Sequence, residues 1–275
     1  MTYKLIDSGE QRKLEQYGNF VLDRPDPQAI WTKGLRASEW GNADARFEKS
    51  WKTNSQIPDK WIAEIGNYNF EISLKNFKHT GVFPEHLENW AFIENCLKIV
   101  NSKFKILNLF GYTGGATLAA AKSGAEVVHV DASKPAILAA KQNAKLNNLE
   151  DAKIRWIEDD AKKFVEREVR RGIKYDGIIM DPPVFGRGAK GEIWKIEENL
   201  LPLLQSIKKI LSDNYKFILL NGYASGYTPL AYGQLLASVF DLDLEGVESG
   251  ELCITESSKR AFSLPAGIFA RYSRK

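Results

Sequence analysis

The segment from Ile106 to Thr117, ILNLFGYTGGAT, constrains the fold of this chain more than any other. It begins as an apolar run that ends at Phe110, breaks at Gly111 and continues into a helical pattern that Gly124 closes. A buried strand, a glycine turn and a helix in this order form the first unit of a doubly wound α/β sheet. Ligands of such sheets bind beyond the carboxyl ends of the strands, so we expect this turn to face a ligand.

The glycine spacing of the turn narrows the class of ligand. A dinucleotide-binding turn reads G-x-G-x-x-G and holds a pyrophosphate at the helix N-terminus, whereas this turn reads G-x-x-G-G from Gly111 to Gly115. Asp131 follows Gly111 by 20 residues, where a carboxylate can accept hydrogen bonds from ribose hydroxyls. A ribose acceptor without a pyrophosphate site indicates an adenosine ligand that lacks phosphates, and S-adenosylmethionine fits. The alternative is a turn without a ligand and a surface aspartate.

The second half of the chain alternates between predicted strands and helices. Strands are expected at 106–110, 127–130, 153–157, 175–180, 216–220, 251–254 and 267–272, and helices at 87–100, 116–123, 134–147, 161–171, 193–211 and 229–240. Single helices between successive strands imply right-handed crossovers and a mostly parallel seven-stranded sheet with helices on both faces. Pro202 is expected to kink or split the longest of these helices.

Residues 1–76 are expected to form a small β-containing module that precedes a domain of residues 77–275. Residues 61–74 alternate around Gly66-Asn67 as a β-hairpin does. Before them, aromatic residues and cations are interleaved: Trp31, Trp40, Phe47, Trp51, Lys33, Arg36, Arg46, Lys49 and Lys52. Such a surface can stack bases and follow phosphates. The alternative, favoured by the small size of the module, is tryptophan as core filler with solvated charges around it.

Acidic residues or glycines stand at the ends of four successive predicted strands: Gly111, Asp131, Asp160 and Asp181. We expect them to gather around one ligand, because parallel strands end at the same edge of a sheet. Asp160 is then placed to accept from an adenine amino group. Asp181-Pro182-Pro183 brings a carboxylate and a turn without N–H donors to the side of the transferable methyl group.

A turn at Thr80-Gly81, followed by Phe83-Pro84, precedes the helix that leads into the first strand of the sheet. Two interpretations stay open for this segment. It is either a lid over the cofactor or a tight linker between the module and the domain.

On these motifs the chain resembles the class I S-adenosylmethionine-dependent methyltransferases. Within them it is most similar to the branch that includes the ribosomal RNA large-subunit methyltransferases, over about residues 77–275. The resemblance is carried by Asn108-Leu-Phe-Gly-Tyr-Thr-Gly-Gly115, Val130-Asp-Ala-Ser133, Asp159-Asp-Ala161, Asp181-Pro-Pro-Val-Phe-Gly186 and Thr80-Gly-Val-Phe-Pro-Glu85. It implies a Rossmann-like α/β fold, S-adenosyl-L-methionine as cofactor and transfer of its methyl group.

The resemblance also implies roles for individual residues. Residues 110–115 would cradle the methionine end of the cofactor, Asp131 would hold the ribose and Asp160 the adenine. The candidate cofactor-binding residues are Thr80, Phe83, Asn108, Phe110, Gly111, Tyr112, Thr113, Gly114, Gly115, Asp131, Ala132, Ser133, Asp160, Ala161 and Asp181, and the candidate catalytic residues are Asp181, Pro182, Pro183 and Phe185. No metal is expected.

Two departures from the relatives bear on the chemistry. Val184 separates Pro183 from Phe185, whereas amine-methylating relatives carry an aromatic residue directly after the second proline. A covalent adduct on a pyrimidine needs an activated thiolate, and the chain has only Cys96, in a predicted helix, and Cys253, in an apolar strand. Both thiols are expected to be buried and inert. We therefore expect direct transfer to a nitrogen or oxygen, with RNA, and ribosomal RNA first, as the acceptor.

Composition sets the broad class of protein. With 44% hydrophobic and 27% charged residues the chain is an ordinary globular protein, and its net charge of +3 permits nucleic-acid binding without arguing for it. Two distant cysteines and the lack of a leader or a membrane-length apolar run predict a cytoplasmic protein without a membrane partner. Three alternatives stay open: a methyltransferase of a small molecule or protein, a dinucleotide-dependent oxidoreductase, and a non-catalytic cofactor-binding scaffold.

Overall fold

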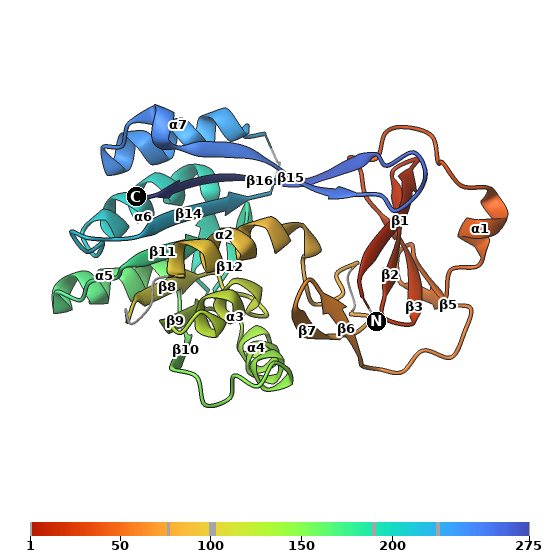
Figure 1. Cartoon of the computed structure of the whole chain (residues 1–275), viewed down its shortest axis with the longest axis horizontal. Coiled ribbons are helices and arrows are strands. Elements are labelled where there is room, and N and C mark those ends of the chain that lie inside the picture. Colours follow the sequence, from red (N-terminus) through yellow and green to blue (C-terminus); the bar gives the residue numbers. More distant parts are fainter. Residues whose placement is uncertain (1, 76–77, 99–102, 189–190, 224–225, 275) are drawn as a thin grey trace. The chain divides into compact units, whose positions relative to one another are not determined.

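The computed structural model describes residues 2–75, 78–98, 103–188, 191–223 and 226–274 (Figure 1). The chain divides into two compact units. Unit 1 consists of Met1–Leu87 with Cys253–Ala266, and unit 2 of Glu88–Leu252 with Gly267–Lys275. The domain boundary predicted at 76/77 lies outside the described residues. A C-terminal segment thus belongs to the N-terminal unit, a feature that the sequence-based division into 1–76 and 77–275 lacks.

Unit 2 is built on a seven-stranded sheet in the order β10-β9-β8-β11-β14-β16-β15. The strands of this sheet are β8 (Lys105–Leu109), β9 (Glu126–Asp131), β10 (Ile154–Glu158), β11 (Gly177–Met180), β14 (Phe217–Gly222), β15 (Glu248–Thr255) and β16 (Ser263–Ser273), and the parts of β15 and β16 within residues 253–266 belong to unit 1. The pairs from β10 to β14 are parallel, and β16 runs antiparallel to β14. The predicted mostly parallel sheet is confirmed. Strand order reverses at β8, between β9 and β11, where ligands of such sheets bind.

Helices cover both faces of this sheet, as predicted. They are α2 (Leu87–Leu97), α3 (Gly115–Lys122), α4 (Lys134–Leu146), α5 (Ala161–Arg171), α6 (Ile196–Lys208) and α7 (Pro229–Phe240), with a 3₁₀ turn at Leu244–Gly246. Side chains of α5, α6 and α7 share one buried cluster with Val128 and Ile218. The neighbouring strand residues point to the opposite face, where Phe217 contacts Phe92 of α2 and His129 contacts α3.

Helix ends agree with the sequence where the signal is local. The side chain of Ser133 accepts from the backbone N–H of Ala136 and caps α4, and Gly172 ends α5 in the left-handed conformation. α6 continues through Pro202 as one helix, so of the two outcomes predicted there the split is wrong and the kink stays a prediction. The predicted end of the helix before β8, Val100, lies outside the described residues.

The start predicted for α6 is also wrong. Ile193–Lys195 form strand β13, which pairs antiparallel with β12 (Phe185–Arg187). Trp194 is 7% exposed and packs into the main cluster, so this segment gains more from tertiary burial than from a longer helix.

Unit 1 contains a five-stranded sheet in the order β1-β2-β3-β4-β5 and a separate hairpin, β6-β7. Its elements are β1 (Lys4–Gly9), β2 (Arg12–Tyr17), β3 (Phe20–Pro25), α1 (Ala37–Gly41), β4 (Ala45–Phe47), β5 (Trp51–Thr53), β6 (Trp61–Ile65), β7 (Tyr68–Ile72) and a 3₁₀ turn at Pro84–His86. The predicted hairpin around Gly66 is confirmed by the β6-β7 pairing. No helix among the described residues of the chain has the length and hydropathy that a membrane span requires.

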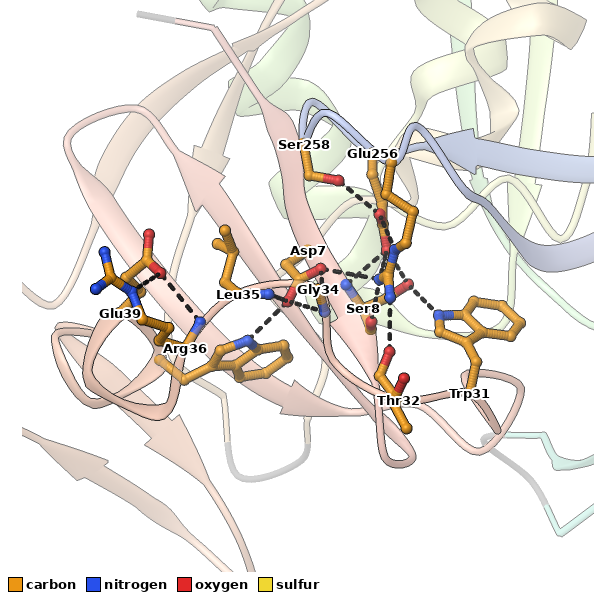
Figure 2. Close-up of polar contacts among 12 residues, drawn as sticks. Asp7, Ser8, Trp31, Thr32, Gly34, Leu35, Arg36, Glu39, Glu256 and Ser258 are labelled. Carbon is orange, nitrogen blue, oxygen red and sulfur yellow. Dashed lines mark hydrogen bonds and ion pairs between the residues drawn. The ribbon is translucent and has the colours of Figure 1, made fainter.

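A buried polar network joins β1 to the C-terminal segment of unit 1 (Figure 2). Glu256 accepts hydrogen bonds from the backbone N–H and the hydroxyl of Ser8, at 2.8 and 2.5 Å. Arg260 donates to Asp7 at 2.9 Å and to Glu256 at 2.6 Å, and Trp40 donates to Asp7 at 2.9 Å. Asp7 and Glu256 are 0% and 3% exposed. The segment is therefore an integral part of unit 1.

Candidate functional site

The turn between β8 and α3 is strained. Phe110 and Tyr112 have φ values of 57° and 47°. This left-handed conformation costs a residue with a side chain on the order of 1–3 kcal/mol and persists only where the surroundings fix it. Here the backbone N–H of Gly111 donates to Val130 at 3.1 Å, and that of Gly114 donates to the Gly111 carbonyl at 2.9 Å. Strain of this kind is typical of ligand sites.

The glycines of the turn lie against interior side chains. A Cβ at Gly111 would stand 2.5 Å from Cε1 of His129, and a Cβ at Gly115 would stand 2.3 Å from Cζ2 of Trp90. Gly114 has φ 93° at the N-cap of α3. Packing beneath the turn and one left-handed position therefore account for the G-x-x-G-G spacing.

Asp131 ends β9 and holds the turn from one side. Its Oδ2 accepts from the backbone N–H of Tyr112 and its Oδ1 from that of Ser133, both at 2.8 Å. Burial raises the pKa of this carboxyl, and the two backbone hydrogen bonds act in the opposite direction. Each carboxylate oxygen has a second lone pair, so Asp131 can still accept hydrogen bonds from two ribose hydroxyls.

Asp160 lies at the same edge of the sheet, because β10 and β9 pair in parallel with Glu158 opposite Asp131. It is the N-cap of α5, and its Oδ1 accepts from the backbone N–H of Lys163 at 2.9 Å. Ala161, the first residue of that helix, is buried. One oxygen of Asp160 thus caps helix α5. The sequence-based prediction gave Asp160 only a contact with adenine.

The Asp181-Pro182-Pro183 loop follows β11 beside the start of the turn. The backbone N–H of Asp181 donates to the carbonyl of Leu109, the last residue of β8, at 3.4 Å. Pro182 is buried and Pro183 is exposed. Phe185, at the start of β12, is 55% exposed, so its ring is available to contact another molecule.

Trp194 joins this loop to the turn, and sequence reasoning missed it. Its indole N–H donates to the carbonyl of Pro183 at 2.5 Å. Its ring meets the ring of Phe110 edge-on, with 5.0 Å between centroids. A tryptophan just after a glycine-rich stretch is the signal that could have found this residue.

Tyr232 of α7, also missed, lies at the end of β14. A Cβ at Gly222 would stand 2.4 Å from its hydroxyl oxygen. The tyrosine is 1% exposed, and across the described ranges its hydroxyl has no hydrogen-bond partner. Burial raises the pKa of Tyr232, and so does the charge of Asp181. The phenol is therefore a protonated donor at neutral pH.

Three further candidate cofactor-binding residues lie in unit 2: Asn108, Thr113 and Ala132. Asn108 is buried under the turn and donates to Thr117 at 2.9 Å, and the carbonyl of Thr113 accepts from Asn143 at 2.9 Å. Ala132 is half-buried beside Asp131.

Thr80 and Phe83 belong to unit 1, whereas the remaining candidates belong to unit 2. Thr80 is buried, and the ring of Phe83 lies 5.4 Å from that of His79 and 6.3 Å from that of His86. Their contact with the cofactor stays a prediction.

Unit 1 uses its tryptophans internally. The indole N–H groups of Trp31, Trp40, Trp51 and Trp61 donate to Ser8, Asp7, Lys75 and Tyr17. Lys33 is held 4.4 Å above the Trp40 ring and 3.1 Å from Glu10. Arg36 and Lys49 are exposed. For the buried Trp40, the interpretation as core filler is the one that fits.

The two cysteines differ from their predicted burial. Cys96 is half-buried on α2, and burial raises the pKa of its thiol to about 11. Cys253 is exposed, because it alternates with the buried Leu252 and Ile254 along an edge strand. Within the described part of the chain no group of three or more His, Cys, Asp or Glu residues is placed to hold a metal ion.

Known proteins are similar to this chain over the segment that contains the candidate site. Residues 49–207 match the family model of S-adenosylmethionine-dependent methyltransferases. The crystal structure of a SAM-dependent methyltransferase from Agrobacterium tumefaciens is 39% identical in sequence, with a TM-score of 0.94 over 100% of this chain and 91% of that one.

Two curated relatives are named for their substrate. Ribosomal RNA large subunit methyltransferase I of Aeromonas salmonicida is 36% identical over 125 residues, which are 45% of this chain and 31% of that protein. Ribosomal RNA large subunit methyltransferase K/L of Shewanella frigidimarina is 33% identical over 165 residues, 58% of this chain and 22% of that protein. The chain thus spans about a third or less of the length of these relatives.

Proposed function

Because the chain belongs to the family of S-adenosylmethionine-dependent methyltransferases, we propose that it methylates RNA, with ribosomal RNA as the first candidate, at a nitrogen or an oxygen. One observation carries the proposal: the glycine turn, Asp131, Asp160 and Asp181 stand at the ends of four adjacent parallel strands. The names of the two curated relatives favour RNA as the acceptor.

The residues of this edge fit an adenosine ligand without phosphates. The turn from Phe110 to Gly115 would hold the methionine end, and Asp131 would accept from the ribose hydroxyls. Asp160 would accept from the adenine amino group, and the backbone N–H of Ala161 would reach a ring nitrogen, since the first N–H groups of a helix have no partner within it. When bound, the cofactor supplies a methyl group on a positively charged sulfur.

Replacement of Asp131 tests this placement. We expect Asp131→Ala to weaken S-adenosylmethionine binding by roughly 1–3 kcal/mol, because it removes the ribose acceptor and the acceptor that holds Tyr112. Titration calorimetry measures the affinity, and circular dichroism checks that the variant is folded. Wild-type affinity in both Asp131→Ala and Asp160→Ala would remove these residues from the site.

On the acceptor side, the chain's own residues align the nucleophile. An in-line displacement needs the nucleophile aligned with the methyl carbon and the leaving sulfur. Asp181 would accept a hydrogen bond from the atom that takes the methyl group, the two prolines would shape the pocket, and Phe185 would supply a wall. Trp194 fixes the loop that carries them. The thiols of Cys96 and Cys253 have no part in this step.

The substrate is tested by mass spectrometry of modified nucleosides. Total RNA from cells that lack this protein should miss one methylated nucleoside, and the purified protein with labelled S-adenosylmethionine should restore it. RNA affinity should fall steeply with salt, as for any phosphate contact, and should fall when exposed Arg36 and Lys49 are made neutral. An unchanged nucleoside profile, with label entering the protein or small-molecule fraction, would exclude RNA.

A further inference from the structure

His129 is a buried polar residue that the proposed chemistry leaves without a task. It lies on β9, two residues before Asp131, and is 0% exposed. Its Nδ1 is 2.8 Å from the hydroxyl of Thr117, which in turn accepts from the side-chain amide of Asn108 at 2.9 Å. Three buried polar side chains, those of Asn108, Thr117 and His129, therefore connect β8, α3 and β9 beneath the glycine turn.

The two ring nitrogens of His129 lie in different surroundings. Nδ1 shares a hydrogen bond with the Thr117 hydroxyl, and its direction depends on the tautomer, because a hydroxyl can accept from both Asn108 and the ring or donate to the ring. Nε2 is buried and has no partner at hydrogen-bonding geometry in the described ranges. Burial lowers the pKa of His129 to about 3, against a smaller opposite effect of the Tyr112 backbone. The ring is neutral at physiological pH.

The ring also sets how deep the turn can lie. A Cβ at Gly111 would stand 2.5 Å from Cε1, 2.6 Å from Nδ1 and 3.1 Å from Nε2 of His129. Gly111 is not among the described residues with positive φ, so a left-handed backbone is not what requires glycine at this position. Trp156 packs against the imidazole with 4.8 Å between ring centroids and so limits how far the ring can move away from Gly111. His129 is therefore what requires glycine at 111.

We propose that His129 is a positioning residue of the cofactor site. Its neutral ring supports Gly111 from below and so keeps Phe110 and Tyr112 in the strained conformation that shapes the turn. The proposal rests on the proposed function, since the turn holds a cofactor only if the chain binds S-adenosylmethionine there. It predicts an energetic coupling between positions 111 and 129 that appears in cofactor affinity.

A double-mutant cycle, read by calorimetric titration with S-adenosylmethionine, measures this coupling. In the His129 background Gly111→Ala should weaken binding about tenfold or more. In the His129→Ala background, where the ring no longer meets the new methyl group, the same change should cost less than about threefold. Gly115→Ala is the matched control. Its methyl group meets Trp90, so its cost should be the same in both backgrounds.

Separate measurements distinguish a loss of folding from a loss of the turn's geometry. Melting temperatures without cofactor report the fold, so a loss of affinity at unchanged melting temperature belongs to the turn. If Gly111→Ala does not fold, His129→Asn decides, because it keeps a polar partner for Thr117 but leaves space under Gly111. Additive effects at 111 and 129, or wild-type affinity in His129→Asn, would overturn the proposal. Absence of binding in the wild-type protein would overturn the proposed function first, and this proposal with it.

Discussion

Replacing Asp181 by alanine is expected to slow methyl transfer to RNA by about 10²–10⁴-fold, the range over which a positioned proton-accepting group contributes. Asp181 is the one candidate carboxylate that follows β11, where its backbone meets the end of β8 at the start of the turn. The adjacent prolines carry no backbone N–H, so they offer the Asp181 carboxylate no donor that would compete with the nucleophile. Affinity for S-adenosylmethionine should stay within a factor of about three, because the ribose and adenine contacts assigned to Asp131 and Asp160 are untouched.

Matched variants separate chemistry from folding in this experiment. Asp181→Asn keeps the shape of the side chain and one acceptor oxygen, so it should fall between wild type and alanine if Asp181 orients the nucleophile. The double variant Cys96→Ser, Cys253→Ser should transfer methyl groups at the wild-type rate, because neither thiol lies in the loops after β11 or β14. Initial rates with labelled S-adenosylmethionine measure all three. Full activity in Asp181→Ala, or none in a folded double variant, would contradict the direct mechanism.

Local signals in the sequence predicted much of unit 2. The apolar runs, the glycine turn and the Ser133 cap act over a few residues, so strands 106–110 and 127–130 and the helix after Ser133 appear close to where they were expected. Asp131 and the Asp181 loop lie at the predicted edge for the same reason, since parallel strands end at one edge, and their functional roles stay predictions.

Residues that act across the fold were not found. Trp194 has a helical neighbourhood in sequence, yet its hydrogen bond to Pro183 and its contact with Phe110 make its segment a strand. His129 lies inside an apolar run in the sequence. Its role depends on contacts with Gly111 and Thr117, which only the folded structure brings to it. These contacts join elements whose pairing no local pattern encodes.

Unit 1 shows the same limit most clearly. Glu256 and Arg260 meet Asp7 and Ser8 across about 250 positions of sequence, so nothing near residue 7 announces that the C-terminal segment completes this unit. The sequence-based boundary placed all of 77–275 in one domain, whereas residues 253–266 belong with the N-terminal strands.

Removal of Arg260 is expected to destabilise unit 1 by about 3–5 kcal/mol, the cost of leaving buried charges without their partner. Its guanidinium donates to Asp7 and to both carboxylate oxygens of Glu256, and also to the carbonyls of Ser8 and Thr32. In Arg260→Ala the buried carboxylates of Asp7 and Glu256 would lose the cation that both of them contact. Urea unfolding with tryptophan fluorescence measures the change, since Trp31 and Trp40 bond to Ser8 and Asp7 of this network.

Arg36→Ala is the matched control, because Arg36 is 88% exposed and its ion pair with Glu39 spans 3.6 Å. An exposed pair of this kind contributes about 0–1 kcal/mol, so this variant should unfold like the wild type. Equal unfolding midpoints for Arg260→Ala and Arg36→Ala would show that the network does not hold the C-terminal segment in unit 1.

The stability that Arg260 contributes through Glu256 should depend on pH in a known direction. Burial raises the pKa of Glu256, but its hydrogen bonds with Arg260, Ser8 and Ser258 outweigh burial and leave the pKa below its ordinary value. A carboxyl with a lowered pKa in the folded state contributes stability above its unfolded pKa of about 4.3 and loses it as the pH falls. The difference between wild type and Arg260→Ala should therefore be full at pH 7 and shrink below pH of about 4. A difference that stays constant to acid pH would mean that Arg260 acts through packing alone.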